Sequence, residues 1–327
     1  MDIQRLEKEI FRMIGPQDFE AVALETFRFQ ASHCAPYAQY LSLLDVDPAF
    51  VKSTAEVPFL PIEFFRSHEV YSAYAPPTLV FTSSGTTGEQ TSRHMVYRPG
   101  LYRESFTRGF KHFYGPAGRY SIFALLPSYM EREGSSLAYM AEALHGENPA
   151  RGGFFLYDHG QLADALVRAK DSGEKILLIG VTFALMDFAE KYSLDLGDAM
   201  VMETGGMKGR RREVSRDELH AFLRERLGVP AIHSEYGMAE LLSQAYSSGG
   251  GVFSSPLWMR VSVRDLQNPL RKIDGAGHGG IDIIDLANLY SCSFISTGDL
   301  GTVYPDGGFE VHERIHGEML RGCNMLV

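Results

Sequence analysis

The chain is short of cysteine and has no long apolar run. Its three cysteines, Cys34, Cys292 and Cys323, lie far apart and are odd in number. They predict neither a disulfide framework nor a CxxC-type metal site, and they are typical of a reducing cytosol. Charged and apolar residues alternate over residues 1–11, and no run of about 18 apolar residues occurs elsewhere. We expect a cytoplasmic protein without a signal peptide or a membrane span.

Positive charge is also scarce. Lysine and arginine together number 31 against 41 aspartates and glutamates, which gives a net charge of −10. A chain this acidic is a poor candidate for binding a phosphate backbone over a broad surface, so no nucleic-acid partner is expected. Any anion that the protein binds must be held locally, by backbone amides, a metal ion or a few cations.

The length and the hydrophobic pattern predict an α/β protein. At ~100–200 residues per domain, the 327 residues suit two lobes or one large body with an appendage, and the 45% hydrophobic content is ample for a core. We expect a helical N-terminal segment over residues 1–75, an α/β body over 76–250 and a β-rich subdomain with a short tail over 251–327.

Short apolar runs alternate with helical patterns through the middle of the chain. Strands are expected at 78–82, 120–126, 153–157, 175–181, 199–203 and 230–234, and helices at 101–113, 135–144, 161–170, 183–192 and 215–227. Ser215 with Glu218 forms a capping-box start for the last of these helices. The alternation predicts a mostly parallel sheet with helices on its faces, and ligands bind beyond the carboxyl ends of such strands.

The sharpest local signal directly follows the expected strand at 78–82. Seven positions hold five hydroxyl side chains and two glycines: Thr82, Ser83, Ser84, Gly85, Thr86, Thr87 and Gly88. The glycines let the backbone turn its N–H groups inward as an anion nest, and the hydroxyls add donors without charge. No Gly-Lys-Ser/Thr closes the run, so it is not a Walker loop. A plain surface loop is the alternative. The position after a strand favours phosphate binding, with Arg93 or His94 supplying positive charge.

Three further motifs follow expected strands. Residues 234–240 carry Tyr236, whose ring can lie flat under a purine, and Glu240, which can face a phosphate-bound metal ion one helical turn on. Residues 296–299 put the Asp299 carboxylate on a tight turn, suited to both hydroxyls of a ribose. Residues 203–209 hold glycines that let a flat ring approach the backbone. Each motif alone is equally typical of a surface helix, turn or loop.

The order and spacing of the four motifs resemble the signature series of the adenylate-forming superfamily, which includes acyl-CoA synthetases, non-ribosomal peptide adenylation domains and luciferases. Within it, the sequence is most similar to the acyl-protein synthetases of the LuxE family, which activate fatty acids for the bioluminescence reductase. That likeness lies in residues 57–65 (VPFLPIEFF), 126–137 (LPSYMEREGSSL) and 203–210 (ETGGMKGR). The resemblance covers roughly residues 50–320, and the combination is more specific than any single motif.

The resemblance implies the N-terminal domain of an adenylate-forming enzyme, which converts a carboxylic acid and ATP into an acyl-adenylate and pyrophosphate. It implies ATP and Mg²⁺ as cofactors and a small carboxylic acid, expected to be a fatty acid, as partner. By matching position, Ser83 to Gly88 would hold the β- and γ-phosphates, Glu240 would hold Mg²⁺, and Asp299 would bind the ribose. By the same matching, Gly205 and Gly206 would flank the adenine and Tyr236 would stack on it, with Glu235 and Gly237 as further nucleotide-binding residues. Arg314 matches the arginine that contacts ribose or phosphate at the domain hinge.

The sequence departs from the family pattern in three places. Glu89 and Gln90 stand where the family's phosphate loop continues with Pro-Lys, and Glu313 stands where a glycine commonly precedes the arginine. Only 13 residues follow Arg314, because the chain ends at residue 327 (327 − 314 = 13). We therefore expect the mobile C-terminal domain of full-length ligases, with its adenylation lysine, to be absent or vestigial.

A thiol is the expected acyl acceptor. LuxE-type synthetases are thought to carry the acyl group on a cysteine near the C-terminus, which makes Cys323 a candidate; nearby Arg321 would lower the pKa of its thiol. The alternative is an unreactive tail cysteine. Two other functions remain open: a ligase that releases free acyl-CoA, and a non-catalytic nucleotide-binding subunit. Cys34 and Cys292 are expected in the core, and the weakest assignment is an acyl pocket lined by Tyr129, Met130, Phe183 and Met207.

Overall fold

The chain folds into two compact units that exchange segments. The computed structural model describes residues 2–83, 91–205 and 214–314. The first unit comprises residues 1–105, 239–243 and 254–327, and the second comprises 106–238 and 244–253. The N-terminal and C-terminal parts share the first unit because strand β1 (Leu60–Pro61) pairs in parallel with β13 (Phe294–Val303).

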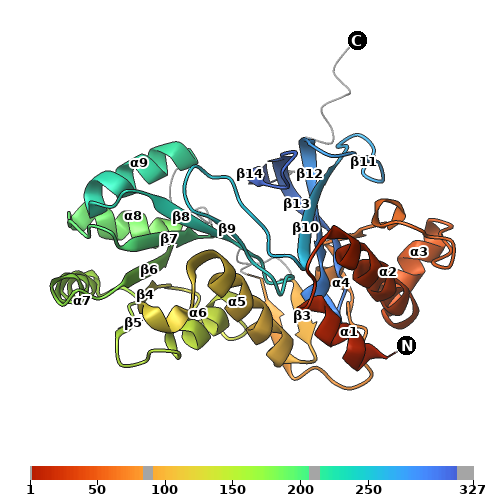
Figure 1. Cartoon of the computed structure of the whole chain (residues 1–327), viewed down its shortest axis with the longest axis horizontal. Coiled ribbons are helices and arrows are strands. Elements are labelled where there is room, and N and C mark those ends of the chain that lie inside the picture. Colours follow the sequence, from red (N-terminus) through yellow and green to blue (C-terminus); the bar gives the residue numbers. More distant parts are fainter. Residues whose placement is uncertain (1, 84–90, 206–213, 315–327) are drawn as a thin grey trace, which may run out of the picture. The chain divides into compact units, whose positions relative to one another are not determined.

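The second unit is built on a six-stranded sheet in the order β5-β4-β6-β7-β8-β9. All neighbours are parallel except β8 and β9, which are antiparallel. Helices α8 and α9 lie on one side of this sheet, and α5 and α6 lie on the other (Figure 1). The strands are β4 (Ser121–Leu125), β5 (Gly152–Phe154), β6 (Ile176–Val181), β7 (Met200–Thr204), β8 (Ile232–Tyr236) and β9 (Ala245–Ser247), and the helices are α5 (Pro99–Tyr114), which begins in the first unit, α6 (Ser136–His145), α7 (His159–Asp171), α8 (Thr182–Lys191) and α9 (Arg216–Leu227).

The strand order of this sheet confirms the predicted α/β fold class and contains a reversal of the direction in which successive strands are added. From β4 the chain passes through α6 to β5 on one side, whereas from β6 it passes through α8 to β7 on the other. Strands β4 and β6 therefore flank a topological switch point, where doubly wound sheets bind ligands beyond the carboxyl ends of the strands. The loop after β4 contains Ser128 with φ 67°, a backbone conformation that non-glycine residues seldom adopt. The capping box at Ser215 and Glu218 is confirmed.

The first unit is built on a mainly antiparallel six-stranded sheet in which β13 pairs with β1, β12 and β14. A separate hairpin, β2 (Leu79–Thr82) with β3 (Arg93–Val96), flanks the Ser/Thr/Gly run. The remaining strands are β10 (Met259–Arg264), β11 (Lys272–Ile273), β12 (Gly277–Asp285) and β14 (Phe309–Arg314), and the helices are α1 (Ile3–Ile10), α2 (Pro16–His33), α3 (Ala35–Leu43) and α4 (Phe64–Ser67), with short 3₁₀ turns at Thr54–Glu56 (η1), Ala117–Arg119 (η2, in the second unit) and Leu286–Asn288 (η3). None of the described helices is both long and apolar enough to cross a membrane.

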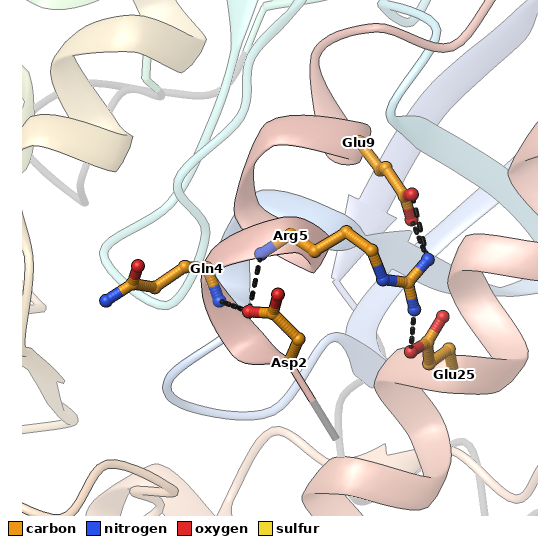
Figure 2. A network of polar contacts seen from close by, with 5 residues as sticks. All are labelled: Asp2, Gln4, Arg5, Glu9 and Glu25. Atoms are coloured by element: carbon orange, nitrogen blue, oxygen red, sulfur yellow. Dashed lines mark hydrogen bonds and ion pairs between the residues drawn. The ribbon is translucent and has the colours of Figure 1, made fainter.

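The N-terminal helices pack on the sheet of the first unit through aromatic side chains. The Phe27 ring on α2 meets the Phe294 ring edge-on, with centroids 5.8 Å apart, and the Arg260 guanidinium lies 4.0 Å from the centre of the Phe19 ring. Helix α1 begins after Asp2, whose carboxylate accepts the backbone N–H groups of residues 4 and 5, and Arg5 joins Glu9 and Glu25 (Figure 2). Those ion pairs are exposed and contribute little, so the buried rings hold these helices.

Two of the expected motif conformations are wrong. No helix follows Tyr236: the chain turns through residues 237–244 and then forms β9, so Glu240 lies on a turn. Asp299 does not lie on a tight turn either, because residues 296–299 are part of strand β13. The cysteine expectation holds for Cys34 and Cys292, which are buried and free. Cys323 lies outside the described residues.

A buried ion pair ties three strands of the first unit together. The Arg264 guanidinium on β10 donates to the Asp282 carboxylate at 2.7 Å and to the carbonyl oxygens of Ile281 and Thr297 at 2.8 and 2.6 Å. Both charged side chains are buried, with 9% and 3% of their surface exposed. The arginine therefore fixes Thr297, two residues before Asp299.

Removing one partner of this pair should destabilise the protein more than removing both. Arg264→Met leaves the Asp282 carboxylate buried without its cation, and we expect it to lower the free energy of unfolding by about 3–5 kcal/mol. Adding Asp282→Leu should recover most of that loss, because the buried carboxylate that lost its guanidinium partner is then gone. Urea unfolding of the three proteins measures this, and a double variant no more stable than Arg264→Met would contradict it.

Candidate functional site

The carboxyl edge of the second unit's sheet collects polar side chains from three neighbouring strands. Glu203 and Thr204 end β7, Glu235 and Tyr236 end β8, and Thr182 follows β6 directly. Parallel pairing sets Val181 beside Thr204 and Thr204 beside Glu235, so these groups lie at one level of the sheet. The sequence-predicted residues of β7 and β8 are thus brought together.

Glu203 is the centre of a buried polar network. The Thr182 hydroxyl oxygen lies 3.1 Å from the Glu203 carboxylate and 2.8 Å from the carbonyl oxygen of Gly205, and its single hydrogen bonds one of the two. His220 on α9 lies on the other side, with its Nε2 3.7 Å from a Glu203 oxygen. Strand β7 and the start of the loop after it are therefore held by side chains from α8 and α9.

The Glu235 carboxyl group is buried beside a hydroxyl and a second acidic residue. Its oxygen accepts a hydrogen bond from Thr204. The pKa of Glu235 is raised to about 7, mainly by burial. The negative charge of Glu203 also raises this pKa, whereas the hydrogen bond from Thr204 lowers it. Near neutral pH this group is therefore close to half protonated.

Two glycines keep the backbone at this edge open. Gly205 has φ +67°, and a Cβ atom there would lie 3.2 Å from the Tyr129 hydroxyl in the loop after β4. At Gly237, a Cβ atom would lie 2.6 Å from a Glu235 carboxylate oxygen. A larger residue at either position would meet these neighbours. Tyr236, which directly precedes Gly237, is partly exposed, and its ring centre lies 5.8 Å from that of Phe253.

In the first unit, Asp299 and Arg314 form a pair across β13 and β14. They are direct register partners, and the Arg314 Nε lies 3.5 Å from the Asp299 carboxylate. The Asp299 backbone N–H donates to the Thr297 hydroxyl at 3.1 Å, and that hydroxyl donates to the Ile281 carbonyl at 2.8 Å. These two hydrogen bonds hold the backbone that carries the Asp299 carboxylate, while the Arg314 side chain is largely exposed.

Glu240 is a buried carboxylate in the same unit. Burial raises its pKa, while a hydrogen bond from Ser92 and the positive charges of Arg314 and Arg66 act in the opposite direction. Within the described ranges, no three His, Cys, Asp or Glu residues come together as a metal site. Mg²⁺ is commonly bound by one or two carboxylates together with substrate phosphates and water, so a single buried carboxylate fits it.

His94 does not supply the positive charge expected of it. Burial lowers its pKa to about 4, and its Nδ1 lies 2.9 Å from the Ala239 carbonyl oxygen, to which it donates. The ring is therefore neutral at pH 7. Arg93 is exposed at the end of the β2–β3 hairpin, opposite Thr82. Ser83, the next residue, pairs with Ser92 through two hydrogen bonds of 2.9 and 3.1 Å.

Several predicted site residues lie outside the described residues. They are Ser84, Gly85, Thr86, Thr87, Gly88, Gly206 and Cys323. Sequence reasoning in turn missed Thr182 and Arg66. A threonine directly after a buried apolar strand is a signal that could have marked Thr182, whereas no local pattern marks Arg66.

No protein-family model and no curated protein matches the sequence. Solved structures do match. A 2-hydroxyisobutyryl-CoA ligase in the postadenylation state, in complex with R3-HIB-AMP, is similar over 90% of this chain and 68% of that chain, with a TM-score of 0.68 and 13% identity. ATP-bound MatB from Rhodopseudomonas palustris is similar over 72% of this chain and 47% of that chain, with a TM-score of 0.53 and 14% identity. The O-succinylbenzoate coenzyme A synthetase of Bacillus subtilis, in complex with AMP, gives 0.51 and 14%, over 72% of this chain and 49% of that chain.

The chain has the fold of the N-terminal domain of adenylate-forming enzymes. At identities of 13–14% the likeness establishes the fold. The chain spans about half the length of the latter two structures, 47% and 49%.

The pKa of Glu235 predicts a pH-dependent stability. Its folded pKa of about 7 lies above the ordinary 4.5, so folding favours the neutral form. The stabilisation is complete below pH 4.5 and is lost as the pH rises to about 7, amounting to about 3 kcal/mol. Relative to Glu235→Gln, the natural protein should lose that much unfolding free energy across this window. Urea unfolding of both proteins at several pH values measures it, and parallel pH profiles would argue against the assignment.

Proposed function

We propose that the protein activates a carboxylic acid, a fatty acid in our reading, with ATP and then transfers the acyl group to a thiol, as an acyl-protein synthetase of the LuxE type. In the first step a carboxylate oxygen attacks the α-phosphorus of ATP, which gives an acyl-adenylate and releases pyrophosphate. In the second step a thiolate attacks the acyl carbon, which forms a thioester and releases AMP.

The single observation that carries this proposal is the fold shared with ligases determined in complex with AMP, ATP or an adenylate over most of this chain. Two motifs of the series support it, because residues 203–209 begin at the end of β7 and residues 234–240 begin at the end of β8, and doubly wound sheets bind ligands beyond such strand ends. Both reactants are anions that repel each other, so the site must neutralise charge and hold the two in line.

In the second unit, the carboxyl edge of the sheet suits a nucleobase. The proposed roles are adenine contact at Gly205 and Gly206 and stacking on Tyr236, with Glu235 and Gly237 beside it. A flat ring needs close backbone approach on one side, and Gly205 provides it because, among the described residues, only the Tyr129 hydroxyl stands near the position of a Cβ atom. A partly exposed tyrosine such as Tyr236 can stack on a base at a gain of about 1–3 kcal/mol.

In the first unit, the proposed roles concern ribose, phosphate and metal. The Asp299 carboxylate would accept the ribose hydroxyls, with Arg314 contacting ribose or phosphate. The run from Thr82 to Gly88 would hold the β- and γ-phosphates, with the exposed Arg93 nearby and His94 as a neutral neighbour. Glu240 would hold Mg²⁺, which when bound neutralises phosphate charge.

The acceptor thiol divides the proposal into two branches. LuxE-type resemblance favours a cysteine of the protein itself, Cys323, or of a partner protein. The similarity to CoA ligases favours coenzyme A as the acceptor. Both branches share the adenylation step.

Adenylation is tested by acid-dependent exchange of labelled pyrophosphate into ATP with Mg²⁺ and a panel of carboxylic acids of increasing chain length. We expect exchange with at least one acid. Gly205→Ala should raise the KM for ATP about tenfold, because the new methyl group crowds the adenine edge. No exchange with any acid, together with saturable ATP binding, would favour a non-catalytic nucleotide-binding subunit.

Gly173→Ala is the matched control for that variant. Gly173 has φ +70°, close to the +67° of Gly205, but no atom of the described residues lies within 4 Å of the place that a Cβ atom would take there. Both variants should lose about 1 kcal/mol of stability from the left-handed backbone. Only Gly205→Ala should change the KM for ATP, and an equal change in the control would trace the effect to backbone strain.

The acceptor is tested with Cys323→Ser. We expect a radiolabelled fatty acid to label the natural protein through a hydroxylamine-sensitive thioester in the presence of ATP. The variant should lose this label and keep pyrophosphate exchange, because the serine hydroxyl is a far weaker nucleophile than a thiolate. Cys34→Ser is the control, since that thiol is buried. Undiminished labelling of Cys323→Ser would exclude this residue, and free acyl-CoA as the main product would favour coenzyme A.

A further inference from the structure

The chain segment that carries Glu240 has no regular secondary structure of its own. Residues 239–243, called here the Glu240 segment, consist of turns and bends in the first unit. A glutamate side chain has three rotatable torsions. Its carboxylate can therefore be held at one position only if the backbone that carries it is also held in place. Something other than a helix or strand must therefore hold this backbone.

Asp285 holds the second half of the Glu240 segment. One oxygen of its carboxylate accepts the backbone N–H groups of Leu242 and Ser243, at 2.8 and 2.9 Å. The other accepts the Ser243 hydroxyl at 2.5 Å and the Ala287 backbone N–H at 3.1 Å. Asp285 is fully buried. A buried carboxylate with four donors is a strong and rigid acceptor, because each bond to a charged group is worth more than a neutral one.

Asn288 holds the first half. Its side-chain amide donates to the Glu240 carbonyl oxygen at 2.8 Å, and the residue is fully buried. His94 adds a bond to the preceding carbonyl, that of Ala239, at 2.9 Å. Side chains from elsewhere in the same unit therefore bind the backbone on both sides of Glu240.

Further hydrogen bonds hold Asp285 and Asn288 themselves in place. Asp285 caps the start of the η3 turn, and Asn288 is the last residue of that turn. Gln30 on α2 donates to the carbonyl oxygens of Asn288 and Leu289, both at 3.0 Å, and accepts the Ser293 N–H at 2.8 Å. These groups are buried, so their hydrogen bonds compete little with water and hold the turn in one arrangement.

We propose that Asp285 and Asn288 are positioning residues that fix the Glu240 backbone so that its carboxylate meets the Mg²⁺ carried by the nucleotide. This inference rests on the proposed function, because it takes Glu240 as the metal ligand. Groups that orient a metal ligand commonly change metal affinity by about 10–100-fold when they are replaced, without touching the metal.

The test measures metal binding apart from activity. Mn²⁺ replaces Mg²⁺ and is titrated by electron paramagnetic resonance into the full chain saturated with ATP, and ATP affinity is measured separately in EDTA. Asp285→Asn puts an amide where four donors converge, so we expect Mn²⁺ affinity to fall about tenfold and ATP affinity in EDTA to change less than about twofold. Asn288→Ala removes a single bond and should weaken Mn²⁺ binding in the same direction.

A double-mutant cycle separates positioning from general loosening. If Asp285 acts through the Glu240 carboxylate, Asp285→Asn should have no further effect on Mn²⁺ affinity in a Glu240→Gln background. Glu20→Gln is the matched control: its carboxylate also accepts an N–H and a hydroxyl, both from Thr54, at 2.6 and 2.7 Å, in a turn apart from the Glu240 segment. That variant should leave Mn²⁺ and ATP affinities unchanged.

Each result has a distinct meaning. Natural Mn²⁺ affinity in folded Asp285→Asn and Asn288→Ala, or an effect of Asp285→Asn that persists in full beside Glu240→Gln, would overturn the inference. If Asp285→Asn does not fold, Asn288→Ala and its cycle with Glu240→Gln decide. A protein that binds Mn²⁺ with ATP but shows no acid-dependent pyrophosphate exchange would overturn the proposed function, while the metal titrations still decide the inference.

Discussion

The structure depends on giving every buried carboxylate a hydrogen-bond donor or a cation as a partner. Among the residues that the structure describes, six acidic side chains are at most 7% exposed: Glu203, Glu235, Glu240, Asp282, Asp285 and Asp299. Burying a carboxylate without partners is far too unfavourable to be tolerated, so each must be ionised with donors around it or neutral. Each of the six has at least one hydroxyl, amide or cationic partner within its own unit. Meeting this requirement fixes the strand ends and turns on which the candidate site residues lie.

The compensation takes different forms, and the form decides what each group can do. Asp282 has a guanidinium and serves to join strands. Asp285 has four donors and serves to hold a turn. Glu235 accepts a hydrogen bond from the Thr204 hydroxyl, lies beside the acidic Glu203, and titrates near neutrality. Glu240 has one hydroxyl with two arginines acting on it from farther away, and so it retains capacity for a further cation.

Much of the fold follows from local sequence, and the parts that do not follow have a common cause. The alternating strands and helices of the second unit and the capping box at Ser215 depend on residues within a few positions, and the structure confirms them. The helix expected after Tyr236 is wrong because Asp285, 43 residues beyond Leu242, binds backbone groups that a helix would otherwise bond internally. Asp299 continues a strand because its neighbours pair with β12 and β14, although Gly298 and Asp299 are turn residues by local preference.

The positive charge near the candidate site residues also cannot be predicted from neighbouring residues in the sequence. Arg93 and His94 are adjacent in the sequence, yet burial lowers the pKa of His94 and leaves its ring neutral, while Arg93 stays exposed. Positive charge near Glu240 comes instead from Arg66 and Arg314, which are 248 positions apart in the chain (314 − 66 = 248). Arg66 is brought there because β1, just before it, pairs with the strand that carries Asp299. In a chain with a net charge of −10, pairing with strand β13 thus brings two cations from distant parts of the sequence close to Glu240.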